Sequence, residues 1–352
     1  MKKIFAIALA ALAVLVGCTK PSDQKTSNVD LTELNALIAE CESLATTAAS
    51  ETYPLESIEA FKKVIADVKG AAEKATTQAA VTSLITRLRD AKKAFEESAV
   101  DAVKADDIIM ALSFDEGTGT ELKTTGKYQW TAKLQKGAEE LFPETKLPEF
   151  VEGKVGKAMH FADASHLSIG DFVPSAVPGI KALSISCWVK PDELRASNYI
   201  ISIDSWHVWK FQTQDGGKPF LTLATDKGIT DMDNETDGSV EPGKWAHLVV
   251  AWTSETGDIN MYVNGQLTKT WEGTAHDGKH GVGSSIAAIA ADRTDIVEIA
   301  IGSDETINMK RGADNAQIAA WDAYFHGAID ELAVYSIALS QGQVSKLYND
   351  QK

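Results

Sequence analysis

The spacing of apolar residues changes near residue 106, and this change divides the chain into two kinds of structure. Between residues 31 and 103, apolar side chains recur at intervals of three and four, the repeat of an amphipathic helix. From residue 106 onward, short alternating or apolar runs stand between turn signals, as in β-strands. The sequence therefore predicts a multidomain chain in which an all-α domain is followed by an all-β domain.

Three apolar stripes run through residues 31–103, separated by polar breaks before Pro54 and around Gly70. Amphipathic helices joined by such short connections predict an antiparallel three-helix bundle. The motifs around Tyr53–Phe61 and Ala75–Val81 resemble the FIVAR-type helical modules of bacterial surface proteins. No cluster of ionisable residues in this stretch suggests chemistry, so we expect the bundle to act as a spacer.

Residues 1–17 have the features of an export signal. Lys2 and Lys3 precede an apolar run that is too short to span a bilayer, which takes about 20 residues. The motif Leu15-Val16-Gly17-Cys18 resembles the bacterial lipobox, which implies removal of residues 1–17 and a lipid on Cys18. An ordinary cleaved signal with an incidental cysteine is the alternative. The polar stretch 18–30 predicts a flexible tether, so we expect a protein anchored in the cell envelope, at the outer membrane and facing either side.

The net charge restricts the possible binding partners, and the cysteine positions restrict the possible disulfides. The formal net charge is −16, which repels nucleic acid phosphates and excludes a nucleic-acid-binding function. Cys41 and Cys187 fall in different predicted domains, so we expect no disulfide between them and read both as small buried residues.

Six motifs from residue 112 onward follow one another in a recognisable order. They are Leu112–Gly119, Gly153–Phe161, Ser184–Pro191, Gly243–Val249, Met261–Gly265 and Phe325–Tyr335. Their order and spacing resemble a LamG-like, concanavalin A-like jelly-roll domain over residues 106–350. The resemblance implies a jelly-roll sandwich. It leaves the function open, because this fold hosts lectins, adhesion modules and enzyme appendages alike.

Two aspartates are the candidate metal ligands. Alternation places Asp330 on the same face as Ala328, Leu332 and Val334, where an unpaired carboxylate is costly. Asp115 ends the first predicted strand, which in such sandwiches lies beside the last one. Two carboxylates meeting there would suit one structural Ca²⁺. The alternative is that Asp330 accepts hydrogen bonds from backbone amides and binds no metal.

Glycan binding requires exposed aromatic rings beside polar groups. Trp206 is the first candidate, because it lies at a predicted strand end or hairpin; the loop residues Trp271, Trp321 and Tyr324 come second. Packing in the core or at the rim is the alternative for each of them. Four acidic residues between Asp231 and Asp237 alternate along the chain, and we interpret them as a solvated loop.

Catalysis is not expected from the sequence. Laminarinase-type glycosidases of this fold carry two glutamates around an aspartate on one strand. Here the residue two positions before Asp330 is Ala328, and the residue after Glu331 is Leu332, so the second catalytic carboxylate is missing. We therefore expect a non-catalytic protein that binds a glycan or surface polymer. A structural or adhesion module that binds protein partners is the alternative, and a glycoside hydrolase is the least favoured function.

Overall fold

The computed structural model describes residues 29–48, 52–100, 103–170, 172, 179–203, 207–286, 298–304 and 323–352. The predictions for the export signal and for Cys18, Trp206 and Trp321 lie outside these residues. No helix within the described ranges combines the length and apolar character needed to cross a membrane.

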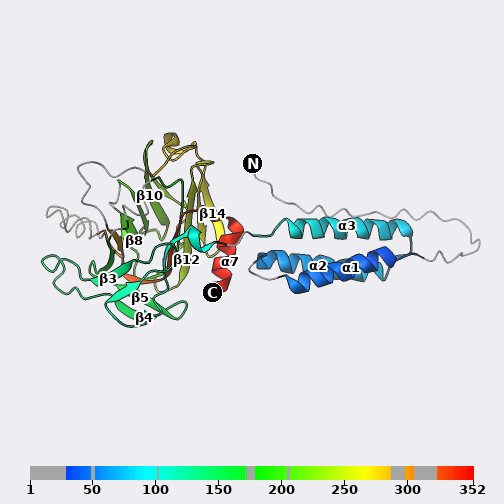
Figure 1. The fold of residues 1–352 in the computed structure, drawn as a ribbon, viewed down its shortest axis with the longest axis horizontal. Helices are drawn as coiled ribbons and strands as arrows, with labels where there is room; N and C mark the ends of the chain where they lie inside the picture. Colours follow the sequence, from blue (N-terminus) through cyan, green and yellow to red (C-terminus); the bar gives the residue numbers. More distant parts are fainter. Residues whose placement is uncertain are drawn as a thin grey trace, which may run out of the picture. The chain divides into compact units, whose positions relative to one another are not determined.

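The helical region consists of α1 (Thr32–Thr47), α2 (Leu55–Ala72) and α3 (Gln78–Glu96) (Figure 1). Each helix buries one apolar stripe, as its spacing predicts. The buried residues include Leu34, Ile38, Cys41 and Ala45 of α1, Ile58, Phe61, Ile65 and Val68 of α2, and Val81, Ile85, Leu88 and Phe95 of α3. Surface ion pairs such as Arg89–Glu33, at 2.6 Å, add little to this apolar contact.

Among the described residues, the β region forms two antiparallel eight-stranded sheets. The first, named the β7 sheet, contains β14 (Gln266–Trp271), β13 (Ile259–Val263), β12 (Ala246–Thr253), β7 (Ala182–Pro191), β16 (Gly327–Tyr335), β5 (Lys157–Phe161) and β4 (Glu149–Glu152) in that order, and β1 (Ile108–Leu112) also pairs with β16. The second, named the β9 sheet, runs β11 (Gly228–Asp233), β10 (Pro219–Thr225), β9 (Trp209–Thr213), β8 (Asn198–Ile203), β15 (Ile299–Ile301), β6 (His166–Ile169), β3 (Thr131–Gln135) and β2 (Glu121–Lys123).

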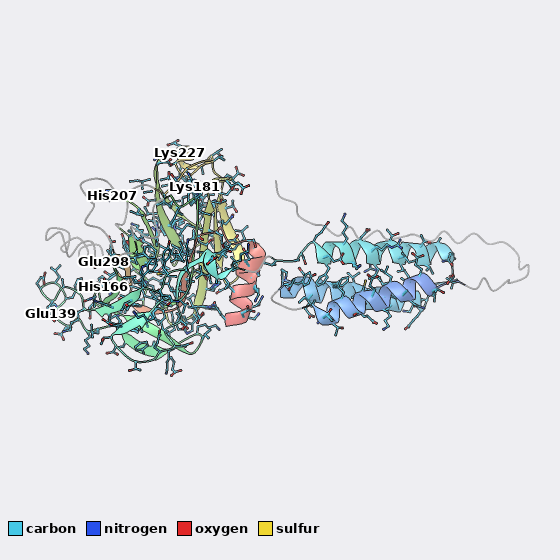
Figure 2. The ribbon with its side chains drawn as sticks, viewed as in Figure 1. Glu139, His166, Lys181, His207, Lys227 and Glu298 are labelled. Carbon is cyan, nitrogen blue, oxygen red and sulfur yellow. The ribbon has the colours of Figure 1, made fainter. Side chains whose placement is uncertain are left out.

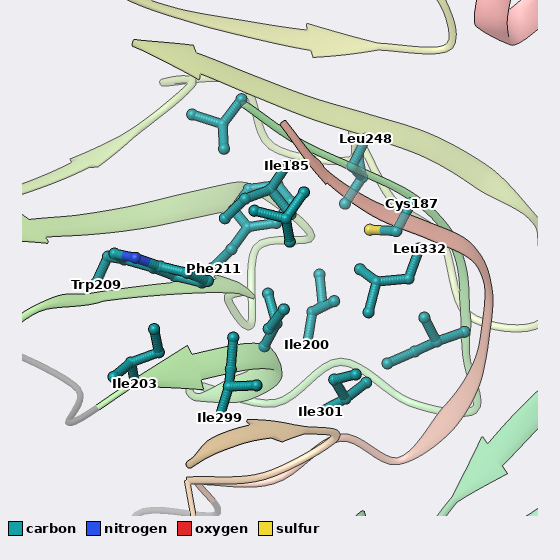
Figure 3. Close-up of a cluster of buried hydrophobic side chains, with 14 of the residues drawn as sticks. Ile185, Cys187, Ile200, Ile203, Trp209, Phe211, Leu248, Ile299, Ile301 and Leu332 are labelled. Carbon is teal, nitrogen blue, oxygen red and sulfur yellow. The ribbon is translucent and has the colours of Figure 1, made fainter. Parts of the chain in front are cut away.

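The hydrophobic core lies between the two sheets (Figure 3). Alternate residues of β7 enter it, namely Leu183, Ile185, Cys187 and Val189, as the sequence predicts. Trp209 and Phe211 face them from β9 and are fully buried. Burial raises the pKa of the Cys187 thiol. The predicted fold class, an all-α region followed by a concanavalin A-like jelly-roll sandwich, is confirmed.

Two local predictions near the C-terminus are also confirmed. The Asn264-Gly265 pair forms the β13–β14 turn with φ of 50° and 79°, the left-handed conformations that a two-residue hairpin needs. Ser340 caps α7 (Gln341–Gln351), because its hydroxyl accepts from the Gln343 amide while the Gln343 side chain accepts from the Ser340 amide.

One register prediction is wrong, and the reason is a β-bulge in β16. Asp330 pairs with Trp188 of β7, but the next pair joins Ala333 to Ser186, so β16 contains one extra residue. Glu331 takes up this residue with φ of 47°. The bulge reverses the alternation, so that Leu332 faces the core whereas Asp330 lies on the opposite face.

Candidate functional site

A depression of about 560 Å³ lies where the edge strands of the two sheets meet, between β11 and β14. Phe220 of β10 and Trp271 at the end of β14 line it, and four carboxylates surround these rings: Asp231, Asp233, Glu235 and Asp237. We name this site the acidic depression. In this depression Trp271 lies beside the acidic segment 231–237. The sequence identified the tryptophan and the acidic segment as separate features and gave no sign that they meet.

The β10–β11 hairpin, whose turn carries Lys227 (Figure 2), sets the polar side of the depression. Phe220 pairs with Asp233 across the hairpin, so both side chains lie on the face of the β9 sheet that points away from the core. Met232, between Asp231 and Asp233, points the other way and is buried in the core. Strand alternation therefore presents carboxylates and an aromatic ring together on one face.

Trp271 is fixed in place by both sheets. Its indole Nε1 donates to the Asp233 carbonyl oxygen at 2.8 Å, across the gap between the two edge strands. The Lys269 ammonium lies 4.0 Å from the ring centroid, and the His276 ring approaches at 4.9 Å between centroids. The indole is therefore a rigid, half-buried wall of the depression rather than a fully exposed platform.

Two lysines partly neutralise the carboxylates. The Lys218 ammonium lies 3.0 Å from Asp233 and 3.9 Å from Asp237, and Lys269 is ion-paired with Glu235. The hydrogen bond to Asp233 raises the pKa of Lys218 and so keeps this group charged. The Asp237 side chain is 82 % exposed, whereas that of Asp233 is 21 % exposed. Together with the Lys210 ammonium, which interacts with Asp231, three ammonium groups face four carboxylates, so the depression keeps a net negative charge.

Buried polar groups continue from the depression along the outer face of the β9 sheet. Gln212 pairs with Phe220 in register and is only 3 % exposed. Its Oε1 atom accepts no hydrogen bond among the described residues. Lys210, on the same face of β9, has its ammonium 5.7 Å from the Phe220 ring, and burial lowers its pKa to about 8.

Tyr324 is not an exposed platform for a ligand. It is only 6 % exposed, with Phe142 packed edge-on at 5.3 Å between ring centroids and the Arg195 guanidinium 4.8 Å from its ring centroid. The sequence left packing open as the alternative for this residue, and packing describes its surroundings in the structure.

The turn between β4 and β5, Gly153–Lys157, holds the two predicted metal ligands, and we name it the carboxylate turn. Asp330 is fully buried, and its Oδ2 accepts from the Lys154 and Val155 amides at 2.7 and 2.9 Å. The Lys157 amide donates to Asp115 Oδ1 at 2.9 Å. β1 pairs with β16, as the sequence predicts, which places both aspartates beside the same turn.

Burial raises the pKa of Asp330 to about 6, and the nearby Asp115 charge adds to this effect. Burial also raises the pKa of Glu331 to about 7, with further contributions from the charges of Asp330 and Asp115. Within the described ranges, no group of three or more His, Cys, Asp and Glu side chains is placed to hold a metal ion. Amide donation to Asp330 corresponds to the metal-free alternative, and calcium stays a prediction.

Comparisons with known proteins agree with the sandwich fold. Residues 162–296 match the family model described as the concanavalin A-like lectin/glucanases superfamily. The mouse pentraxin-related protein PTX3 is 24% identical over 114 residues, which are 32% of this chain and 29% of that protein. The chain thus spans less than a third of the length of this curated relative.

Two solved structures are similar to parts of this chain. One is domain 4 of AbnA, a GH43 extracellular arabinanase from Geobacillus stearothermophilus in complex with arabinotriose, with a TM-score of 0.47, 19% identity and coverage of 69% of this chain and 98% of that one. The other is the binding domain of botulinum neurotoxin DC in complex with rat synaptotagmin II, with a TM-score of 0.45, 13% identity and coverage of 70% and 52%. The segment matched by the family model includes the whole acidic depression.

Proposed function

We propose that the protein is a lipid-anchored cell-envelope protein that binds a glycan without chemically changing it, and that the acidic depression is its binding site. The observation that carries this proposal is the pairing of two half-buried aromatic rings with polar groups in one hollow. Binding sites for small ligands are concave and combine apolar walls with a few placed polar groups.

The chemistry of the depression suits a sugar. A pyranose ring presents an apolar C–H surface that can lie against the Phe220 and Trp271 rings, whose large faces supply contact area at low entropic cost. Its hydroxyl groups are donors, and the carboxylates of Asp231 and Asp237 are acceptors at the rim of the same hollow. The rigid indole lowers the entropic cost of binding because it is already held in place.

Binding rather than hydrolysis is the favoured activity. A glycosidase needs two carboxyl groups that flank the scissile bond, one as acid and the other as base or nucleophile. In the depression, Asp233 and Glu235 are each ion-paired with a lysine. Asp330, the aspartate nearest to the catalytic pattern of the fold, is fully buried in the carboxylate turn.

The test is binding of the chain 19–352, which lacks the signal and the lipid cysteine, to a polysaccharide panel. We expect Phe220→Ala and Trp271→Ala each to weaken binding by about tenfold or more, the cost of losing a buried aromatic contact. Leu267→Ala is the control, because Leu267 is an exposed residue of the same strand as Trp271. The proposal fails if no polysaccharide binds, or if Phe220→Ala behaves like the control.

The variants Trp206→Ala and Trp321→Ala test whether either of the two remaining aromatic candidates contributes to polysaccharide binding.

The anchor and the cation are proposals with tests of their own. Cys18→Ser should release the protein from the membrane fraction if this cysteine carries the lipid. If Ca²⁺ binds between Asp115 and Asp330, the purified chain should contain calcium and should melt at a lower temperature after chelation. An unchanged melting temperature together with no bound calcium would remove the calcium proposal.

A further inference from the structure

We propose that the glycan bound in the acidic depression carries free amino groups, so that it contains hexosamine units without N-acetyl groups. This inference rests on the proposed function, because it names the ligand class of the same site. It follows from the hydrogen-bonding character and the charge of the depression.

The depression offers mostly acceptors. Its four carboxylates accept hydrogen bonds and cannot donate them when ionised; two lysine ammonium groups form ion pairs with them, and a third, that of Lys210, interacts with Asp231. A ligand rich in acceptors, such as a uronate or a sulfated sugar, would place negative charge against this rim and would gain few hydrogen bonds. A ligand that brings ammonium groups supplies donors and compensates the net charge.

Gln212 is a second, independent sign that the ligand brings donors. Its Oε1 atom is buried and accepts no hydrogen bond from the described residues, on the same sheet face as Phe220 and in register with it. An unsatisfied buried acceptor is costly. Gln212 lies beside the depression and not in its lining, so a ligand donor would satisfy this atom once the side chains that cover it move aside.

The aromatic walls also favour cations. Ammonium groups of the protein itself already lie over both rings, Lys269 at 4.0 Å from the Trp271 centroid and Lys210 at 5.7 Å from the Phe220 centroid. The faces of these rings thus lie in surroundings that accept positive charge, as expected from their negative quadrupole. A ligand ammonium is attracted to the face of such a ring and repelled by its edge, so the face of Phe220 is where it would bind.

Asp237 is the carboxylate best placed to form an ion pair with an ammonium group of the ligand. Its side chain is 82 % exposed, and its ion pair with Lys218 is long, at 3.9 Å, because this lysine lies closer to Asp233. Asp237 can therefore turn to a ligand ammonium without first breaking a short ion pair. Replacing it with asparagine keeps the shape, removes the charge and exchanges one acceptor oxygen for an NH₂ donor.

The experiment compares two oligosaccharides that differ only in acetylation: chitosan oligomers and chitin oligomers of equal length, titrated into chain 19–352. We expect the deacetylated oligomer to bind about tenfold more tightly at low salt, with the difference shrinking as salt screens the charges. Asp237→Asn should reduce this preference about threefold or more, because it weakens binding of the deacetylated oligomer more than binding of the acetylated one. Asp350→Asn, which removes the same charge from α7, is the matched control.

Each outcome decides between the two proposals. If the acetylated oligomer binds as tightly as the deacetylated one and Phe220→Ala weakens both, the amino-group inference is overturned while the proposed function stands. If neither oligomer binds, the inference is overturned, and the polysaccharide panel decides the proposed function. A preference that Asp237→Asn and Asp350→Asn reduce equally reflects only the net charge of the protein, and it also overturns the inference.

Discussion

The acidic depression and the carboxylate turn both contain several carboxylates, but the two regions differ in how exposed these groups are and in which groups compensate their charge. In the depression, Asp237 is largely exposed and Asp233 is balanced by a lysine ammonium. In the turn, Asp330 is fully buried, and its charge is met by backbone amides. The first arrangement leaves charge available to a ligand, whereas the second uses a carboxylate to fix a turn.

This difference shows that the hydrogen-bond donor beside a carboxylate indicates whether the carboxylate supports the fold or can bind a ligand. The residues next to the carboxylate in the sequence indicate this less well. Amides in a tight turn cannot move away without unfolding the turn, so Asp330 and the Gly153–Lys157 backbone form one structural unit. A lysine on a flexible stem can exchange its partner for a ligand. Substitutions should therefore separate the two regions, by stability in one and by binding in the other.

The largest expected effect is that of Asp330→Ala. It removes the buried acceptor of the Lys154 and Val155 amides, and we expect the free energy of unfolding to fall by about 2–4 kcal/mol. Urea denaturation of the variant measures this loss. Asp237→Ala, the same change in the depression, is the control and should cost less than about 0.5 kcal/mol. Equal losses would show that the two regions do not differ as we argue.

The pH dependence of stability should come from the turn. The pKa values of Asp330 and Glu331 are raised to about 6 and about 7 in the folded state, from 3.8 and 4.5. The folded chain thus holds these protons more tightly than the unfolded chain. Their contribution to stability is therefore greatest below about pH 4 and is lost as pH rises to 7, by on the order of 1–3 kcal/mol.

Urea denaturation between pH 4 and pH 8 tests this sign. Glu331→Gln keeps the shape of the protonated side chain and can still accept the hydrogen bond from Gln351. We expect this variant to flatten the upper part of the curve. Parallel curves for the variant and the original chain would show that the pH dependence arises elsewhere.

Two glycines offer a matched and smaller test. Gly156 and Gly238 both have positive φ, 51° and 73°, so alanine costs about 1 kcal/mol at either position. At Gly156 the new Cβ would also lie 2.0 Å from Asp115 Oδ1, whereas at Gly238 nothing lies within 4 Å. We expect Gly156→Ala to cost roughly twice as much as Gly238→Ala in urea denaturation. Equal costs would mean that Asp115 moves aside freely.

The fold could be predicted from the sequence to a large extent, because strand alternation is a local property. The residues of β7 and the Asn264-Gly265 turn show this directly. The face of Asp330 could not be predicted, since one extra residue at Glu331 reverses the alternation and leaves no clear local signal. The acidic depression could not be predicted either, because Phe220 and Trp271 come from edge regions of different sheets that only sheet packing brings together.

The smallest expected effect on stability is that of Asp237→Asn, and this small effect is what makes the variant informative. The aspartate is exposed and its ion pair with Lys218 is long, so we expect the melting temperature to change by no more than about 2 °C. The same substitution should reduce the preference for deacetylated oligomers. A large loss of stability would mean that Asp237 holds the β11 edge together, and the acidic depression would then resemble the carboxylate turn instead of contrasting with it. A stable variant with altered ligand preference would place recognition in one region and structural support in the other.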